Sequence, residues 1–228
     1  MRTIEIDDNY KKILFEVPLF KDLNLHVKSE LLNKLDYTLY HFDKDDLVAK
    51  QGELCNRLFI LLKGKLNVNI LDYYGNEVHI EYIVAPRPFA TPHLFKEDSR
   101  LPATFKAEDE SVLLTVTKDS TFELISQYPN VLKSFLCISG NCNVCTTVRL
   151  DVLSRKTVRD RLIVYFNKMT RPMSNIVITP SLTQLAEYLN VSRPALSTEF
   201  NRMEKEGLLK RIDKNHIEVN NKLSQFLI

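Results

Sequence analysis

The side chains whose types and spacing suggest chemistry lie between residues 181 and 214, where arginine, hydroxyl and amide groups recur at helical spacing. An arginine near the N-terminus of a helix can donate two hydrogen bonds to O6 and N7 of guanine, whereas hydroxyls and amides bind phosphates or base edges. Arg193 is therefore our first candidate for a base contact. The full set of candidate DNA-contacting residues is Ser181, Thr183, Ser192, Arg193, Pro194, Ser197, Thr198, Asn201, Arg202, Arg211 and Lys214.

Two short helices joined by a tight turn are predicted to present these groups. Ser181, with Gln184 three residues later, has the pattern of a helix N-cap. Asn190 tolerates the left-handed conformation of a sharp helix exit. Ser192 then caps a second helix, in whose first turn Pro194 loses no hydrogen bond. The pattern predicts a helix-turn-helix rather than an ordinary helix pair with a solvated polar face, and its buried residues are Leu182, Leu185, Ala186, Leu189, Leu196, Phe200 and Met203.

A two-stranded wing is predicted after the second helix. The apolar-alternating runs Leu208–Ile212 and His216–Val219 are separated by a turn-rich insert at 213–215. Lys210, Arg211 and Lys214 on this wing are expected to reach the phosphate backbone, with an ordinary solvated surface as the alternative.

The distribution of charge agrees with a nucleic-acid partner for the C-terminal part. The 228-residue chain has a net charge of only +2, but residues 151–228 hold 13 Lys and Arg against 8 Asp and Glu, and residues 1–150 hold 18 against 21. No run approaches the roughly 20 apolar residues that span a bilayer, and the N-terminus is too polar for a secretory signal. We therefore expect a soluble cytoplasmic protein without a membrane partner.

Short β-like segments dominate the first half after a predicted helix around Ser29–Leu35. Leu66, Val68 and Ile70 are expected to face Val78, Ile80 and Tyr82 inside an antiparallel roll that suits a ligand pocket. The predicted strands are Tyr37–Phe42, Leu47–Lys50, Leu58–Lys63, Lys65–Leu71, Glu77–Val84, Ala103–Lys106 and Val112–Val116.

A long helix over Val131–Leu153 is predicted to connect the roll to a further helix, Lys156–Lys168. An apolar seam at near-heptad spacing most simply pairs with its copy across a two-fold axis, and packing on its own roll is the alternative. The expected domains are residues 1–125, 126–154 and 155–228. The seam residues are Val131, Phe135, Ile138, Cys142 and Cys145.

The cysteines in and near this seam allow a second interpretation. Cys137, Cys142 and Cys145, with Cys55 as a fourth ligand, match the spacing of plant-type iron–sulfur proteins. Cysteine also serves as a small apolar residue along a helix seam, which is the interpretation we favour.

Taken in order, the roll, the long helix and the winged helix-turn-helix resemble the catabolite-activator or Crp/Fnr superfamily of bacterial transcription regulators. The segments that carry the resemblance are VPLFKDL, QGELCNRLFILLKGKLNV, LFKEDSRLPATFKA and NVSRPALSTEFNRMEKEGLL. The resemblance implies an α+β fold with a cyclic-nucleotide-binding-like roll, a dimerisation helix, and a homodimer whose recognition helices enter successive major grooves of an inverted repeat, ~34 Å apart. It further implies RNA polymerase as a partner.

Two departures from the family pattern affect the expected ligands. Alignment on Phe95 and Ala107 places Ala90-Thr91 and Leu101-Pro102 where cyclic-AMP-binding members carry Gly-Glu and Arg-Ser or Arg-Thr. A buried phosphate without a cation or donors is unfavourable, so we expect no tight cyclic nucleotide binding unless the neighbouring Arg100 supplies the contact. On the recognition helix, Pro194 and Thr198 replace the usual glutamate and second arginine, which predicts a different operator sequence.

Other functions receive less support from the residues. His79 and His93 are candidate haem or metal ligands, with His93 the better placed, although isolated histidines near strands are more often hydrogen-bonded surface residues. No set of nucleophile, base and orienting residue is evident, so we expect that the protein is not an enzyme and that it binds no cofactor. The rival to a DNA-binding regulator is a redox or haem-based gas sensor that acts mainly through protein partners.

Overall fold

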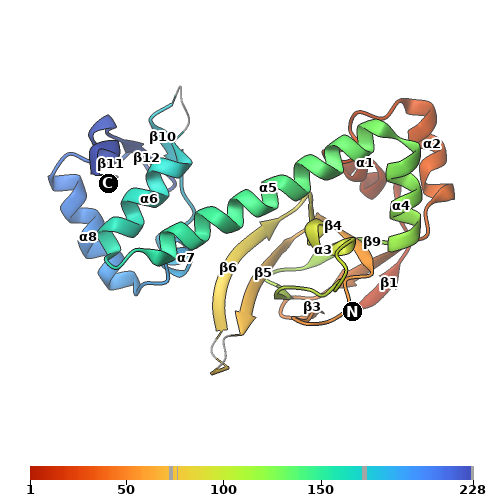
Figure 1. The fold of residues 1–228 in the computed structure, drawn as a ribbon, viewed down its shortest axis with the longest axis horizontal. Helices are drawn as coiled ribbons and strands as arrows, with labels where there is room; N and C mark the ends of the chain where they lie inside the picture. The colour runs from red at the N-terminus through yellow and green to blue at the C-terminus, as the bar shows by residue number, and fades with distance from the viewer. Residues whose placement is uncertain (72–73, 76, 171–173, 227–228) are drawn as a thin grey trace. The chain divides into compact units, whose positions relative to one another are not determined.

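The computed structural model describes residues 1–228 apart from 72–73, 76, 171–173 and 227–228, and it describes only the backbone of residues 143–146, 224 and 226. The chain divides into two compact units, residues 1–143 and 144–228, whose boundary falls within the long helix α5 (Pro129–Ser154; Figure 1).

The first unit contains two antiparallel sheets. The five-stranded sheet has the order β1-β2-β9-β4-β7, and the four-stranded sheet has the order β3-β8-β5-β6. The strands are β1 (Arg2–Ile4), β2 (Tyr37–Phe42), β3 (Leu47–Ala49), β4 (Arg57–Lys63), β5 (Lys65–Leu71), β6 (Glu77–Val84), β7 (Arg87–Phe89), β8 (Thr104–Ala107) and β9 (Ser111–Thr117). All seven predicted strands are present, whereas the short strands β1 and β7 were missed.

Aromatic side chains fill the space between these sheets. Phe59 and Phe89 come from the five-stranded sheet and lie with ring centroids 5.2 Å apart, and Phe105 of the other sheet lies 4.9 Å from Phe89. All three are buried. The predicted antiparallel roll with an apolar interior is confirmed.

One detail of the predicted interior is wrong. The hairpin of β5 and β6 has a β-bulge between Val68 and Asn69, and Leu66 is paired with Ile83. An extra residue in one strand moves the residues beyond it to the other face. Ile83 is therefore the deeply buried residue of β6, at 1% exposure, whereas Tyr82 is only partly buried and its ring lies under the Lys65 ammonium.

In the described part of the first unit, four helices flank the roll before α5 begins, and side-chain caps start the first two of them. Asp7 caps α1 (Asp8–Glu16) and Asn24 caps α2 (Leu25–Lys34), each through its side-chain oxygen. Helix α2 thus begins earlier than the predicted Ser29, and α1 was not predicted. The other two are α3 (Thr91–Leu94) and α4 (Lys118–Gln127).

The first three residues of the apolar seam predicted on the long helix face the core of the first unit. Val131 and Phe135 are 1% and 6% exposed, and Ile138 packs partly against the same cluster of the first unit. These three residues therefore follow the alternative, because the roll supplies an apolar surface within reach. Cys142 of the seam is partly buried, and the Cys145 side chain lies outside the described residues. A different set of apolar residues on α5 is exposed, namely Leu132, Leu136 and Leu150.

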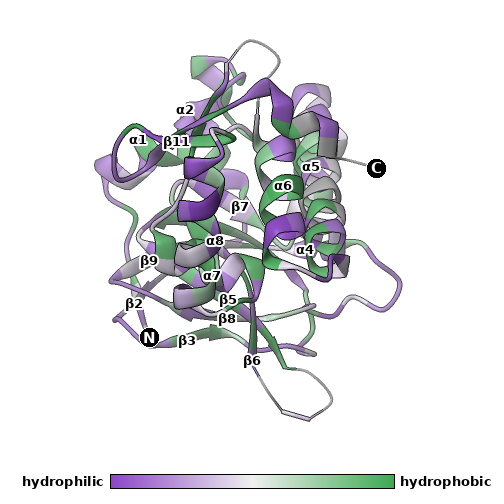
Figure 2. Cartoon of the chain, turned by 90° about the vertical axis from the view of Figure 1, so that its left-hand side faces the viewer, coloured by the Kyte–Doolittle hydropathy of each residue, from purple (hydrophilic) through white to green (hydrophobic). Residues whose placement is uncertain are grey.

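The second unit is a winged helix-turn-helix, as predicted. Helices α6 (Val158–Met169), α7 (Leu182–Leu189) and α8 (Arg193–Lys205) pack around one apolar core (Figure 2). Beside them, β11 (Leu209–Arg211) and β12 (His216–Val219) form the wing. The strand β10 (Ile176–Ile178) pairs with β12, and the short helix η1 (Asn221–Phe226) follows; neither was predicted. The α+β class is confirmed.

Within the described residues, no helix combines the length and the apolar character needed to cross a bilayer.

Candidate nucleic-acid interface

The turn between α7 and α8 is built by the capping residues that the sequence indicates. The Ser181 hydroxyl accepts a hydrogen bond from the Gln184 backbone N–H at 3.3 Å, and the Ser192 hydroxyl accepts one from the Ala195 N–H at 3.4 Å. Asn190 adopts the left-handed conformation, with φ 50° and ψ 54°. These groups end one helix and start the next within three residues, which confirms the predicted helix-turn-helix.

Helix α8 separates its apolar and polar residues onto opposite faces. Leu196, Phe200 and Met203 are completely buried in the second unit, whereas Thr198, Asn201 and Arg202 between them are exposed. Ser197 is partly buried. The exposed candidates on α7 and α8 are Thr183, Arg193, Pro194, Thr198, Asn201 and Arg202.

Several candidate residues also have partners within the protein. Arg202 Nε lies 3.3 Å from Glu206 Oε1. The Arg211 guanidinium lies 4.9 Å from the Phe200 ring centroid and within 3.9 Å of Glu204. Arg193, by contrast, forms no ion pair with any described residue. Its guanidinium is the strongest candidate for a contact with DNA.

The wing carries Lys214 at its tip. Asp213 organises the turn by accepting backbone hydrogen bonds from Asn215 at 2.8 Å and from His216 at 2.9 Å. The Asn215 N–H and then the His216 ring hold the pKa of the Asp213 carboxyl below its usual value. Lys214 is exposed between these residues, where a phosphate contact is sterically open.

Arginines of α6 support the recognition helix, and the sequence did not identify them. Arg159 forms ion pairs with Glu199, at 3.0 Å, and with Glu206 beyond the end of α8. The Glu206 carboxylate, followed by that of Glu199, raises the pKa of Arg159. These partners lie 40 and 47 residues away along the chain, so no local pattern points to them.

Two further arginines bind the carboxyl end of α7, directly before the turn. Arg161 Nη1 donates to the carbonyls of Leu189 at 2.8 Å and Asn190 at 3.0 Å, while its Nε donates to the Arg155 carbonyl at 2.9 Å. Arg149 donates to the Glu187 carbonyl at 3.4 Å. Cations at these carbonyls also complement the negative end of the helix dipole.

Arg149 makes its contact from a buried position. It is 5% exposed, and its guanidinium lies 4.3 Å from the centroid of the Tyr188 ring. Burial lowers the pKa of this guanidinium to about 10, so it stays charged at neutral pH.

Replacing Arg161 by methionine is expected to destabilise the second unit by about 2 kcal/mol, because hydrogen bonds to charged groups contribute about 1.5–3 kcal/mol. The apolar stem is retained, so the loss concerns the hydrogen bonds to the α7 carbonyls. Chemical denaturation measures this effect, and hydrogen exchange at residues 189–192 reports the local opening. Lys168→Met, at an exposed position of the same helix, is the control. Equal stability of the two variants would contradict the assigned role.

The segment equivalent to a nucleotide pocket is packed with apolar side chains. Ala90, Leu94 and Leu101 are 7%, 0% and 3% exposed and belong to the core of the first unit. Ala90 has a left-handed backbone, with φ 55°, before the short helix α3. Thr91 is buried and Pro102 is exposed. The predicted pocket positions thus supply no side-chain cation to the interior.

Arg100, which precedes Leu101 in the sequence, is bound to other groups. Its Nη1 donates to the Gly52 carbonyl at 2.9 Å, and its Nε donates to Asp98 at 3.0 Å. The side chain is 55% exposed. To contact a phosphate, Arg100 would therefore have to give up its hydrogen bonds to the Gly52 carbonyl and to Asp98.

Among the residues whose side chains are described, the alternative metal and haem ligands form no group of three that could hold a metal ion. Cys55 is buried in the roll, where burial raises the pKa of its thiol to about 11, whereas Cys137 is exposed on α5. The Cys145 side chain lies outside the described residues. The His79 ring is hydrogen-bonded to Asn67 at 2.9 Å. His93 is partly buried, and this burial lowers its pKa.

Two family models match the sequence. The model described as "Cyclic nucleotide-binding domain" matches residues 39–128, and the model described as "Crp-like helix-turn-helix domain" matches residues 160–223. Together they cover more than half of the chain. None of the curated proteins compared with the chain matches it.

Solved structures share the fold at low sequence identity. A variant of CooA from Carboxydothermus hydrogenoformans is 17% identical with a TM-score of 0.68, covering 92% of this chain and 99% of that one. FixK2 from Bradyrhizobium japonicum is 15% identical with a TM-score of 0.60, and the match covers 84% of this chain and 97% of that one. The Thermus thermophilus catabolite activator protein is 19% identical with a TM-score of 0.52, and the match covers 92% of this chain and 100% of that one.

Proposed function

The chain belongs to the Crp/Fnr superfamily of transcription regulators, and we propose that it acts in the cytoplasm as a homodimer that binds an inverted-repeat operator. The observation that carries this proposal is Arg193, exposed in the first turn of α8 without an ion-pair partner among the described residues. Its neighbours on the outward face are hydroxyl and amide side chains, which suit phosphates and base edges. No catalytic activity is proposed.

The homodimer is supported by the exposed leucines of α5. Leu132 and Leu136 are 38% and 61% exposed at a spacing of four residues, and Leu150, at 63%, follows Leu136 after two heptads. Leucines repeated at heptad positions pack against the same positions of a partner helix. The dimer surface proposed here thus replaces the seam of Val131 and Phe135.

Selection of genomic DNA fragments by the purified protein tests the proposal. We expect enrichment of a pseudo-palindrome whose half-sites are spaced by about one helical turn. Sedimentation should give twice the chain mass, and Leu136→Glu should give a monomer with weakened operator binding. A monomeric wild-type protein, or retention of fragments without sequence preference at moderate salt, would refute the proposal.

The effector is proposed not to be a cyclic nucleotide. Leu101 and Pro102 offer no side-chain donor, and burying a phosphate without donors is costly. We expect no saturable heat when cyclic AMP or cyclic GMP is titrated to about 1 mM in a calorimeter. Micromolar affinity would contradict this prediction, and its loss in Arg100→Ala would identify the rescuing cation.

RNA polymerase remains the proposed protein partner, on the basis of family membership. We propose no resident cofactor. A haem or iron–sulfur centre remains the alternative; a visible absorption spectrum after anaerobic purification and after haem reconstitution distinguishes these cases, because either centre would colour the protein.

A further inference from the structure

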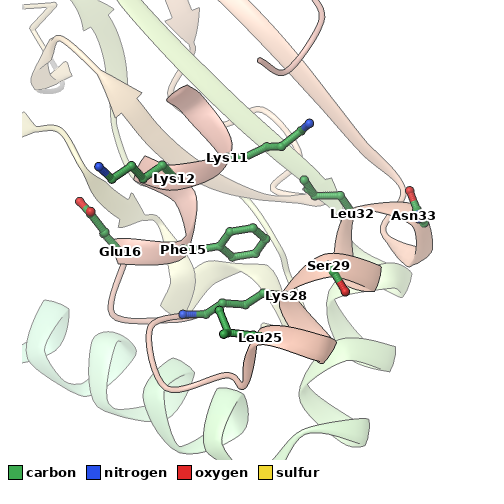
Figure 3. Close-up of a pocket in the computed structure, with 9 residues that line it drawn as sticks. All are labelled: Lys11, Lys12, Phe15, Glu16, Leu25, Lys28, Ser29, Leu32 and Asn33. Carbon is green, nitrogen blue, oxygen red and sulfur yellow. The ribbon is translucent and has the colours of Figure 1, made fainter. Parts of the chain in front are cut away.

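A groove between α1 and α2 lies in a part of the chain that neither family model matches. It has a volume of about 510 Å³ and is lined by one face of each helix (Figure 3). Lys11, Lys12 and Phe15 come from α1, and Leu25, Lys28 and Leu32 come from α2. We call this feature the α1–α2 groove.

The floor of the α1–α2 groove is apolar. Phe15 and Leu32 are partly buried and pack against the core of the first unit, and the Phe15 ring projects from α1 toward α2 (Figure 3). Leu25, the first residue of α2, is 85% exposed. A single exposed leucine is ordinary in a folded protein. Here, however, it extends an apolar surface that two other side chains already form.

The rim of the groove is positively charged. Three lysines line it, against the single carboxylate of Glu16. Lys28 Nζ lies 5.8 Å from the Phe15 ring centroid and donates to the Lys21 carbonyl at 2.9 Å, so its charge is held beside the apolar floor. Lys11 is paired with Asp8 at 2.8 Å, whereas Lys12 forms no ion pair with any described residue.

We infer that the α1–α2 groove docks an acidic amphipathic helix of another protein. Leu25, Lys28 and Leu32 repeat at spacings of three and four residues, which gives a groove parallel to a helix axis and suits an apolar stripe with the same spacing. Carboxylates beside that stripe would meet the lysines of the rim, since complementary charge determines which partner is accepted. This interaction goes beyond DNA binding and does not depend on it.

The test uses the full chain and a fluorescein-labelled alanine-based peptide. The peptide is about four helical turns long, with leucines at i, i+3, i+4 and i+7 and glutamates on both sides of them. We expect saturable binding by fluorescence anisotropy that weakens as salt is added. The peptide with lysine in place of every glutamate should bind at least about tenfold more weakly.

Variants of the protein locate the site. Lys12→Glu combined with Lys28→Glu should weaken binding of the acidic peptide at least about tenfold, and Leu25→Ala should weaken it about threefold to tenfold. The control Lys96→Glu combined with Lys133→Glu makes the same change of net charge at exposed positions outside the groove, and it should leave binding within about twofold. All variants should keep the wild-type circular dichroism spectrum and melting temperature.

Four outcomes would overturn the inference. The first is no saturation below about 1 mM peptide, and the second is equal loss in the groove and control variants. Displacement of the peptide by submillimolar decanoate would reassign the groove to a small anionic amphiphile. Weaker operator binding by the groove variant alone would reassign the lysines to DNA, and that result leaves the proposed regulatory function standing.

Discussion

Arg193→Ala is expected to reduce the free energy of operator binding by about 1–3 kcal/mol at each half-site and to relax selectivity at one base pair in each. The reason is geometric, because the guanidinium can donate two parallel hydrogen bonds to one guanine and alanine supplies none. A competition assay against all four bases at each operator position measures both effects.

Two further variants separate base recognition from charge. Arg193→Lys keeps the positive charge but loses the planar fork, so it should retain binding to unrelated DNA while losing selectivity. Lys222→Ala, which removes an exposed cation from the same unit, should leave selectivity unchanged. An operator footprint unaltered by Arg193→Ala would favour the rival class of sensor, which acts through protein partners.

Phe200→Ala is expected to destabilise the second unit by about 3–5 kcal/mol, because it removes a fully buried aromatic ring and leaves a cavity. The ring centroid lies 6.2 Å from that of Phe166, and the Arg211 guanidinium packs on it. The loss therefore affects α6, α8 and the wing together. Hydrogen exchange should show reduced protection over residues 144–228 and little change over residues 1–143.

Phe122→Ala provides the matched control. The Phe122 side chain is 59% exposed, so the same chemical change creates no cavity there and should cost less than about 1 kcal/mol. If the two alanine variants lost similar free energy of unfolding, burial of Phe200 in the second unit would not be the cause of its destabilisation.

The helix-turn-helix was predictable because its determinants are local. The hydroxyls of Ser181 and Ser192 cap the helices within three residues, and Asn190 adopts the left-handed exit. Leu196, Phe200 and Met203 repeat at the helical period, and all three are buried. Caps, turns and periodicity each involve residues only a few positions apart, so a single sequence contains the necessary information.

The arginine contacts that hold the helix-turn-helix in place were not predictable from the sequence. Arg161 binds the carbonyls of Leu189 and Asn190, which lie 28 and 29 residues away, and Arg159 reaches Glu199 and Glu206 over still longer separations. In the sequence these arginines resemble ordinary surface cations. Only packing of α6 against α7 and α8 brings them to their partners.

By itself, the sequence determined the order of the roll, the long helix and the winged helix-turn-helix, the outward face of α8 and the lack of a phosphate-binding cation at Leu101-Pro102, because residue type and short-range spacing control these properties. The tertiary structure decided which face of α5 is buried, where the bulge turns Ile83 inward, and which lysines line the α1–α2 groove. Each of these depends on competition between surfaces distant in the chain. Val131 and Phe135 suit either a second copy or the chain's own roll, and burial against the roll makes that choice.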